Sequence, residues 1–143
     1  MDEEETPPPS GFDLGHVDVH GSAGEASSRG RTPDQAMMIY LSLTLLLDGL
    51  RRFVSGRERV YSSSAVDSSF SLTFKQGKDG SIETVHDGAL IDRSSAKDLA
   101  TALHAGAERF ATTHLYLLPA DDAGREDLEK SLAEFGRFLS RLD

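Results

Sequence analysis

The sequence contains no cysteine and no tryptophan, and aromatic residues make up only 7% of its 143 positions. Without cysteine the chain can form neither disulfides nor thiolate metal ligands, so nothing in it requires an oxidising compartment. The first nine residues also lack the basic start and the apolar run of a secretory signal. We therefore expect a cytoplasmic protein.

Long hydrophobic runs are absent as well. The longest apolar stretch, "AMMIYLSLTLLL", covers residues 36–47 and falls short of the roughly 20 residues that a bilayer-spanning helix needs. This stretch is better explained as a buried helix. We expect no membrane partner.

Positive charge is scarce, because 15 Lys and Arg residues stand against 24 Asp and Glu residues and give a net charge of −9. Phosphate backbones repel such a surface unless basic residues cluster strongly. The clearest basic group, residues 51–59, lies near a predicted helix end, where cations offset the helix dipole. The charge excludes nucleic acid as the expected ligand and favours a basic protein partner.

The length and composition indicate one domain. Residues 1–10 are acidic and rich in proline, and such a segment cannot bury apolar surface, so we expect a disordered leader. Residues 11–143 form the expected single domain, which is long enough for one core.

The first helix is predicted to run from Thr32 to about Ser55. Thr32 can cap it, Pro33 suits the first helical position, and Gln35 stands three residues after the cap. Its apolar residues extend well beyond one stripe, so we expect this helix to be covered on more than one side. A sheet and a second helix could cover it, or a second copy of the chain in a homodimer.

Two more helices are predicted further along the chain. Ser94 or Ser95 can cap one over residues 96–113, and Asp121 or Asp122 can start the last one. Strand patterns cover residues 12–20, a serine-rich segment from residue 59 onward, and two hairpin strands joined at Asp87-Gly88.

The predicted fold class is therefore α+β: an antiparallel sheet of about four strands packed on about three helices, in the order β-α-β-β-β-α-α. In the hairpin we expect Thr84 to pair with Ile91, which places apolar residues on both faces. One face meets the helices, and the other exposes Ile82 and Ile91. These two residues are our predicted partner surface.

A possible metal site lies in the segment "GHVDVHGS", where His16, Asp18 and His20 occupy alternate positions. Alternate strand residues share a face, and imidazole and carboxylate suit divalent metals. Their spacing of about 7 Å along the strand is too wide for one metal, so His86, His104 or His114 would have to add a ligand. The other explanation is a solvated strand face, with a bulge at Gly15 that turns the valines to the core.

Two functions are compatible with these patterns. The first is a small acidic interaction protein without catalytic activity or cofactor, which masks a partner or associates with itself. Its layout and acidity are similar to those of small immunity proteins and secretion chaperones, although no family motif is present. The second is a hydrolase, dependent on a metal or a serine, with a site at His16, Asp18 and His20.

Overall fold

The computed structural model describes residues 1–142, which form three α-helices, one 3-10 turn and eight short or medium strands. The helices are α1 (Ile39–Ser55), α2 (Ala96–His114) and α3 (Ala123–Ser140), and the 3-10 turn is η1 (Leu115–Leu117). The strands are β1 (Leu14–Gly15), β2 (Asp18–His20), β3 (Glu25–Ser27), β4 (Met37–Met38), β5 (Val60–Ser64), β6 (Ser71–Gln76), β7 (Ile82–His86) and β8 (Ala89–Ser94). No helix in this part of the chain is long and apolar enough to cross a membrane.

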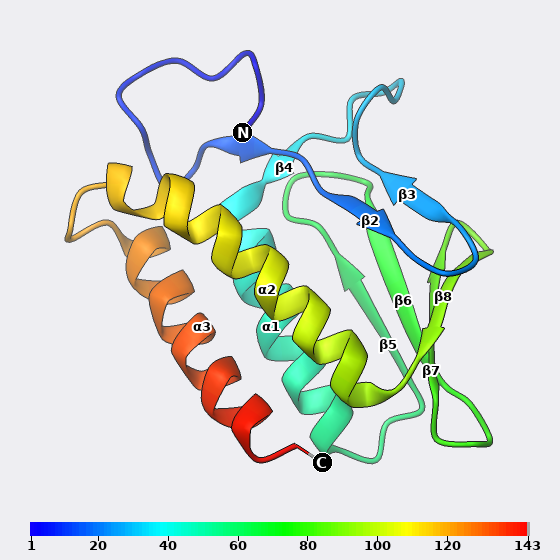
Figure 1. The fold of residues 1–143 in the computed structure, drawn as a ribbon. Coiled ribbons are helices and arrows are strands. Elements are labelled where there is room, and N and C mark those ends of the chain that lie inside the picture. The colour runs from blue at the N-terminus through cyan, green and yellow to red at the C-terminus, as the bar shows by residue number, and fades with distance from the viewer. Residues whose placement is uncertain (143) are drawn as a thin grey trace.

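The main sheet is antiparallel with the strand order β5-β6-β7-β8, and the helices lie on one side of it (Figure 1). The predicted α+β class is confirmed. The N-terminal strands do not join this sheet: β1 pairs with β4, and β2 pairs with β3. The β2–β3 ribbon lies beside the edge strand β8.

Helix α1 is the central element, as its sequence predicts. It packs against α3, α2 and β5, and its Leu47, Leu50 and Phe53 are almost fully buried. Each such side chain contributes about 1.5 to 3 kcal/mol to folding. A hydrogen bond of 2.7 Å from the Ser131 hydroxyl to Asp48 fixes α3 against the polar side of α1. A sheet on one side and helices on the other cover α1 within a single chain.

The start of α1 differs from the prediction. The helix begins at Ile39 rather than just after Thr32, and its N-cap residue Met38 makes no side-chain capping bond. Met37 and Met38 instead form β4, where they pair with Gly15 and Leu14. This pairing with a distant strand overrides the local capping signal, so the chain is extended until residue 38.

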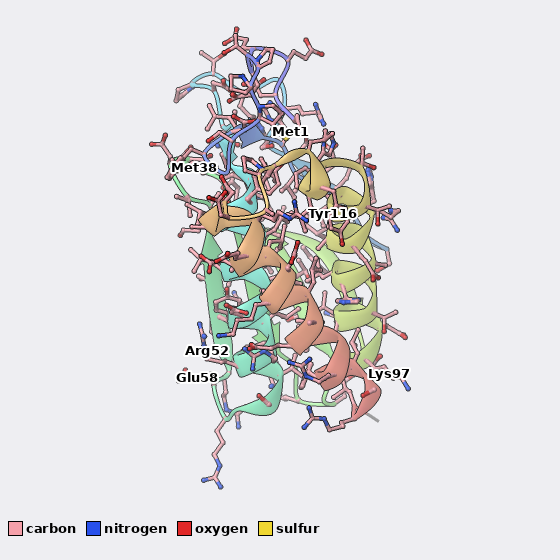
Figure 2. The ribbon with its side chains drawn as sticks, turned by 90° about the vertical axis from the view of Figure 1, so that its left-hand side faces the viewer. Met1, Met38, Arg52, Glu58, Lys97 and Tyr116 are labelled. Atoms are coloured by element: carbon pink, nitrogen blue, oxygen red, sulfur yellow. The ribbon has the colours of Figure 1, made fainter. Side chains whose placement is uncertain are left out.

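The other two helices begin where the sequence indicates. The Ser95 side chain accepts a hydrogen bond from the backbone N–H of Asp98 and caps α2. Asp122 accepts one from Arg125 in the same way and caps α3. Figure 2 shows Tyr116, just after α2, at the end of the molecule that carries Met1, while Lys97 and Arg52 lie at the opposite end. Helix α2 therefore runs antiparallel to α1.

The expected exposure of Ile82 and Ile91 is wrong, because both are buried in the core, with 1% and 2% exposure. Thr84 lies opposite Phe74 of β6, so the even-numbered residues of β7 face the helices. A bulge between Thr84 and Val85 pairs Thr84 with Asp92 instead of Ile91. In this structure the two isoleucines hold the hairpin against the core.

Residues 1–10 contain no helix or strand. Even so, the Asp2 amide donates to the Leu14 carbonyl at 2.9 Å, and the Leu14 amide donates to Glu5 at 2.7 Å. Met1 packs against the core. The disorder expected for this leader stays a prediction.

A close contact between α1 and β5 leads to the first testable prediction. A Cβ at Gly49 would lie 2.0 Å from the hydroxyl oxygen of Tyr61, so Gly49→Ala should destabilise the fold by about 1 to 3 kcal/mol. At Gly136 of α3 a Cβ would meet no atom closer than 3.6 Å. Gly136→Ala should therefore gain up to about 1 kcal/mol from helix propensity. Urea unfolding of both variants measures the difference, and equal gains would contradict the packing of β5 on α1.

Candidate functional site

His16, the first of the three predicted metal ligands, is held inside the fold. Its Nδ1 lies 2.9 Å from the Ser28 hydroxyl and its Nε2 lies 3.4 Å from the Asp2 carboxylate. The side chain is only 9% exposed. The strand is interrupted at residues 16 and 17 rather than bulged at Gly15, so His16 turns inward and the expectation of a solvated imidazole is wrong for it.

Asp18 and His20 are solvent-exposed and paired across the β2–β3 ribbon. Asp18 accepts hydrogen bonds of 2.5 Å from the Ser27 hydroxyl and 3.1 Å from the Arg29 guanidinium. The Ser27 hydroxyl, together with Arg29, lowers the pKa of Asp18 below its usual value. His20 Nδ1 lies 3.2 Å from Glu25, the residue opposite it in the register.

The three remaining histidines lie against aromatic rings instead of reaching this strand. Ring centroids are 4.8 Å apart for His86 and Phe70, 5.6 Å for His104 and Phe135, and 4.8 Å for His114 and Phe110. Burial lowers the pKa of His114. Within residues 1–142, no three His, Asp or Glu side chains form a group that could hold a metal ion. The geometry gives the predicted metal site no support.

A groove of about 720 Å³ lies between α2, α1, the main sheet and the N-terminal strand. We call it the α2 groove. Its walls are apolar side chains from all four elements: Val17, Val19, Ile39, Leu43, Leu46, Leu47, Leu72, Phe74, Leu99, Ala102, Leu103, Ala107 and Phe110. The groove exists because α2 packs against α1 and α3 rather than onto the strands.

One buried hydroxyl group beside the groove has no partner. Thr84 is 2% exposed and lines the groove, and its Oγ1 makes no hydrogen bond within residues 1–142. The Ser94 hydroxyl is also buried, and it lies close enough to the Asp92 carboxylate to lower the pKa of that group. A buried polar group without a partner costs about 1 to 3 kcal/mol, and such groups are rare in folded proteins. Neither hydroxyl oxygen has accessible surface, so a group that enters the groove does not reach them.

Asp92 holds the N-terminal ribbon at one side of the groove. Its carboxylate accepts hydrogen bonds from the Ser22 amide at 3.0 Å and from the Ser22 hydroxyl at 2.9 Å. The Ser22 amide is the main cause of a lowered pKa of Asp92, so the carboxylate is ionised at neutral pH. Gly21 permits this close approach, because a Cβ there would lie 2.3 Å from the Ile91 carbonyl oxygen.

Apart from Asp18, which is paired with Arg29, the remaining charged side chains of the groove lie on α2. Asp98 is in the first turn of the helix, and Arg109 is eleven residues further along, which corresponds to roughly 16 Å of helix. Both side chains line the groove and are solvent-exposed. Neither forms a salt bridge within the described residues. The groove therefore has an acidic end at Asp92 and Asp98 and a basic end at Arg109.

Sequence reasoning places His16, Asp18 and His20 near a site, and all three do line the α2 groove. It missed Thr84, Ser94 and Arg109. The one available signal was Thr84. This polar residue shares one face of β7 with Ile82 and His86, and that face is buried.

Comparisons of this chain with protein-family models, curated proteins and solved structures give no match.

The hydrogen bonds between Asp92 and Ser22 of the β2–β3 ribbon should depend on pH. A carboxyl group with a lowered pKa in the folded state stabilises the fold above its usual pKa, and this contribution is lost as the pH falls through the lowered value. Below about pH 4 we therefore expect the Ala23 amide, which donates to the Ile91 carbonyl at 2.9 Å, to exchange faster with solvent. Hydrogen exchange followed by NMR measures this change.

Ser22→Ala and Ser27→Ala form a matched pair for this prediction. The first should raise the pKa of Asp92 alone, and the second should raise the pKa of Asp18 alone, because each removes one hydroxyl donor. An Asp92 pKa that stays the same in Ser22→Ala would rule out the described contact.

Proposed function

We propose that this chain is a binding protein without catalytic activity of its own, and that its α2 groove holds the apolar part of a partner molecule. The observation that carries the proposal is the groove itself: apolar walls from four elements around a cavity of about 720 Å³. Binding cavities for small ligands range from about 300 to 1,000 Å³ and combine apolar walls with a few polar groups.

Apolar surface that the fold leaves uncovered would drive the binding. Leu43, Leu46, Leu103 and Phe110 line the groove and are only partly buried. A bound apolar group would remove their remaining surface from water, and each square ångström contributes about 25 cal/mol. The net charge of −9 would steer the protein toward a positively charged partner. The cytoplasmic location and self-association expected from the sequence stay predictions.

The hydrolase alternative has less support in the geometry. Each of the three proposed metal ligands already contacts another side chain. The serine-rich turn that follows β5 also has a structural role, because the Ser68 hydroxyl donates a hydrogen bond to the Gln35 carbonyl at 2.8 Å. We therefore base the proposed function on the groove.

A variant that fills the groove tests this function. A Cβ at Gly106 would meet only the end of the flexible Arg109 side chain, at 3.8 Å, so Gly106→Trp should insert its ring into the groove without displacing the backbone. Nile red, a neutral apolar dye, should bind the unmodified protein saturably with a blue-shifted emission. Its affinity should fall by about tenfold or more in Gly106→Trp, which corresponds to at least about 1.4 kcal/mol.

The matched control is Ala133→Trp, which adds the same ring at an exposed position of α3 that does not line the groove. Its dye affinity should equal that of the unmodified protein. Equal dye affinity in Gly106→Trp would show that the groove is not the binding site.

A further inference from the structure

Strand β5 leaves one edge of the main sheet open. The Ala65 amide donates to the Phe70 carbonyl at 2.9 Å, in the same register that pairs β5 with β6. Odd-numbered residues of β5 therefore direct their backbone groups to β6, and even-numbered residues direct theirs away from the sheet. The outward amides and carbonyls belong to Val60, Ser62 and Ser64, and none of them has a backbone partner within residues 1–142.

The other edge of the sheet is protected in ways that β5 is not. Strand β8 carries Asp92 and Arg93, and the β2–β3 ribbon covers it, with a hydrogen bond of 2.9 Å from the Ala23 amide to the Ile91 carbonyl. Folded proteins usually block a sheet edge with charge, proline, a bulge or a covering segment. The sequence of β5, VYSSS, contains no charge and no proline. This edge is therefore suited to pair with another strand.

Helix α1 leaves an apolar strip uncovered next to the same edge. Leu45 and Arg52 lie two turns apart on one face of the helix, between Gly49, which meets β5, and Asp48, which bonds to α3. Leu45 is 50% exposed, and Val60 of β5 is 52% exposed. Figure 2 shows Arg52 on the side of the molecule away from α2. An edge strand and a leucine beside it thus lack a cover on one side of the fold.

A second copy of the chain fits both features. If two β5 strands pair antiparallel about a two-fold axis at Ser62, each Val60 lies opposite Ser64 of the other copy, and all the outward backbone groups form hydrogen bonds. The axis is perpendicular to the sheet, so both α1 helices lie on the same side of it. The Tyr61 hydroxyl donates to the Leu45 carbonyl at 3.2 Å, which places Leu45 level with the middle of β5. The two Leu45 residues would therefore lie close to the axis.

Charge favours this antiparallel pairing. Arg57 and Arg59 precede β5, Asp67 follows it, and all three side chains are exposed without an ion pair in residues 1–142. The two-fold axis brings the start of one β5 to the end of the other, so the arginines of one copy approach Asp67 of the second copy. The net charge of −9 on each copy opposes association, but physiological salt screens it beyond about 8 Å.

From these observations we infer that two copies of this chain associate through β5 into a symmetric homodimer with one continuous antiparallel sheet. Since the β2–β3 ribbon covers β8, each copy offers a single open edge, and association closes at two copies. No residue of β5 lines the α2 groove, and neither does Leu45. The dimer is thus independent of the proposed binding function.

Sedimentation equilibrium tests the dimer. The unmodified protein should have the mass of two chains at concentrations up to about 0.1 mM, where association of protomers is favoured by mass action. Ser62→Lys places two like charges at the axis and should raise the dissociation constant of the dimer about tenfold or more. The matched control, Thr101→Lys, adds the same charge at an exposed position of α2 and should not change it. The mass of a single chain for the unmodified protein would overturn the inference.

A second pair of variants tests the strip on α1. Leu45→Gln should weaken the dimer severalfold, because the two-fold axis removes this leucine from water in both copies. Leu117→Gln is the control, since Leu117 is 63% exposed in η1, away from β5. Circular dichroism checks that the variants fold, and Nile red affinity should be unchanged in Ser62→Lys. A dimer as tight in both Ser62→Lys and Leu45→Gln as in the unmodified protein would show that its interface is not at β5.

Cross-linking locates the axis directly, because the chain contains no cysteine. The Cα atoms of a hydrogen-bonded antiparallel pair are about 5.5 Å apart, a separation that a disulfide spans. Oxidised Ser62→Cys should therefore run as a covalent dimer under non-reducing conditions, and Thr101→Cys should stay a single chain. No covalent dimer from Ser62→Cys would contradict the assigned axis. A single-chain protein that binds the peptide RVYSSSA would show that the β5 edge takes a peptide instead of a second copy.

Discussion

The burial of α1 between the sheet and the two other helices is the constraint on which the rest of the structure depends. Its apolar residues continue around the helix, so a sheet alone cannot cover them, and α2 and α3 must both pack against it. Since α2 is held by helices, it does not settle onto the strands. The groove between α2 and the sheet is therefore a consequence of how the central helix is covered.

Local signals in the sequence predicted the elements that depend on neighbouring residues. Ser95 and Asp122 cap their helices because a capping bond spans only three residues, and Asp87-Gly88 turns the hairpin between His86 and Ala89 as expected. The predicted start of α1 was wrong because residues more than twenty positions away determine where the helix begins. Met38 joins Leu14 in a strand pair, and no capping pattern around Thr32 contains that information.

The difference between local signals and contacts with distant residues also explains the outcome of the site predictions. The alternation of His16, Asp18 and His20 was a sequence pattern, but cross-strand neighbours determine what those side chains do, and the partners Ser28, Ser27 and Glu25 come from a second segment. Thr84 shows the reverse. A polar residue on a buried strand face usually has a partner, so only the surrounding side chains reveal that its hydroxyl has none.

The buried hydroxyl of Thr84 shows where the core carries a cost. Its oxygen lost its hydrogen bonds to water on folding and gains none within residues 1–142, which costs about 1 to 3 kcal/mol. A valine at position 84 would fill the same space against Phe74 without that cost. Each fully buried leucine of α1 contributes about 1.5 to 3 kcal/mol, so the apolar contacts of the same core are sufficient to offset one hydroxyl without a partner.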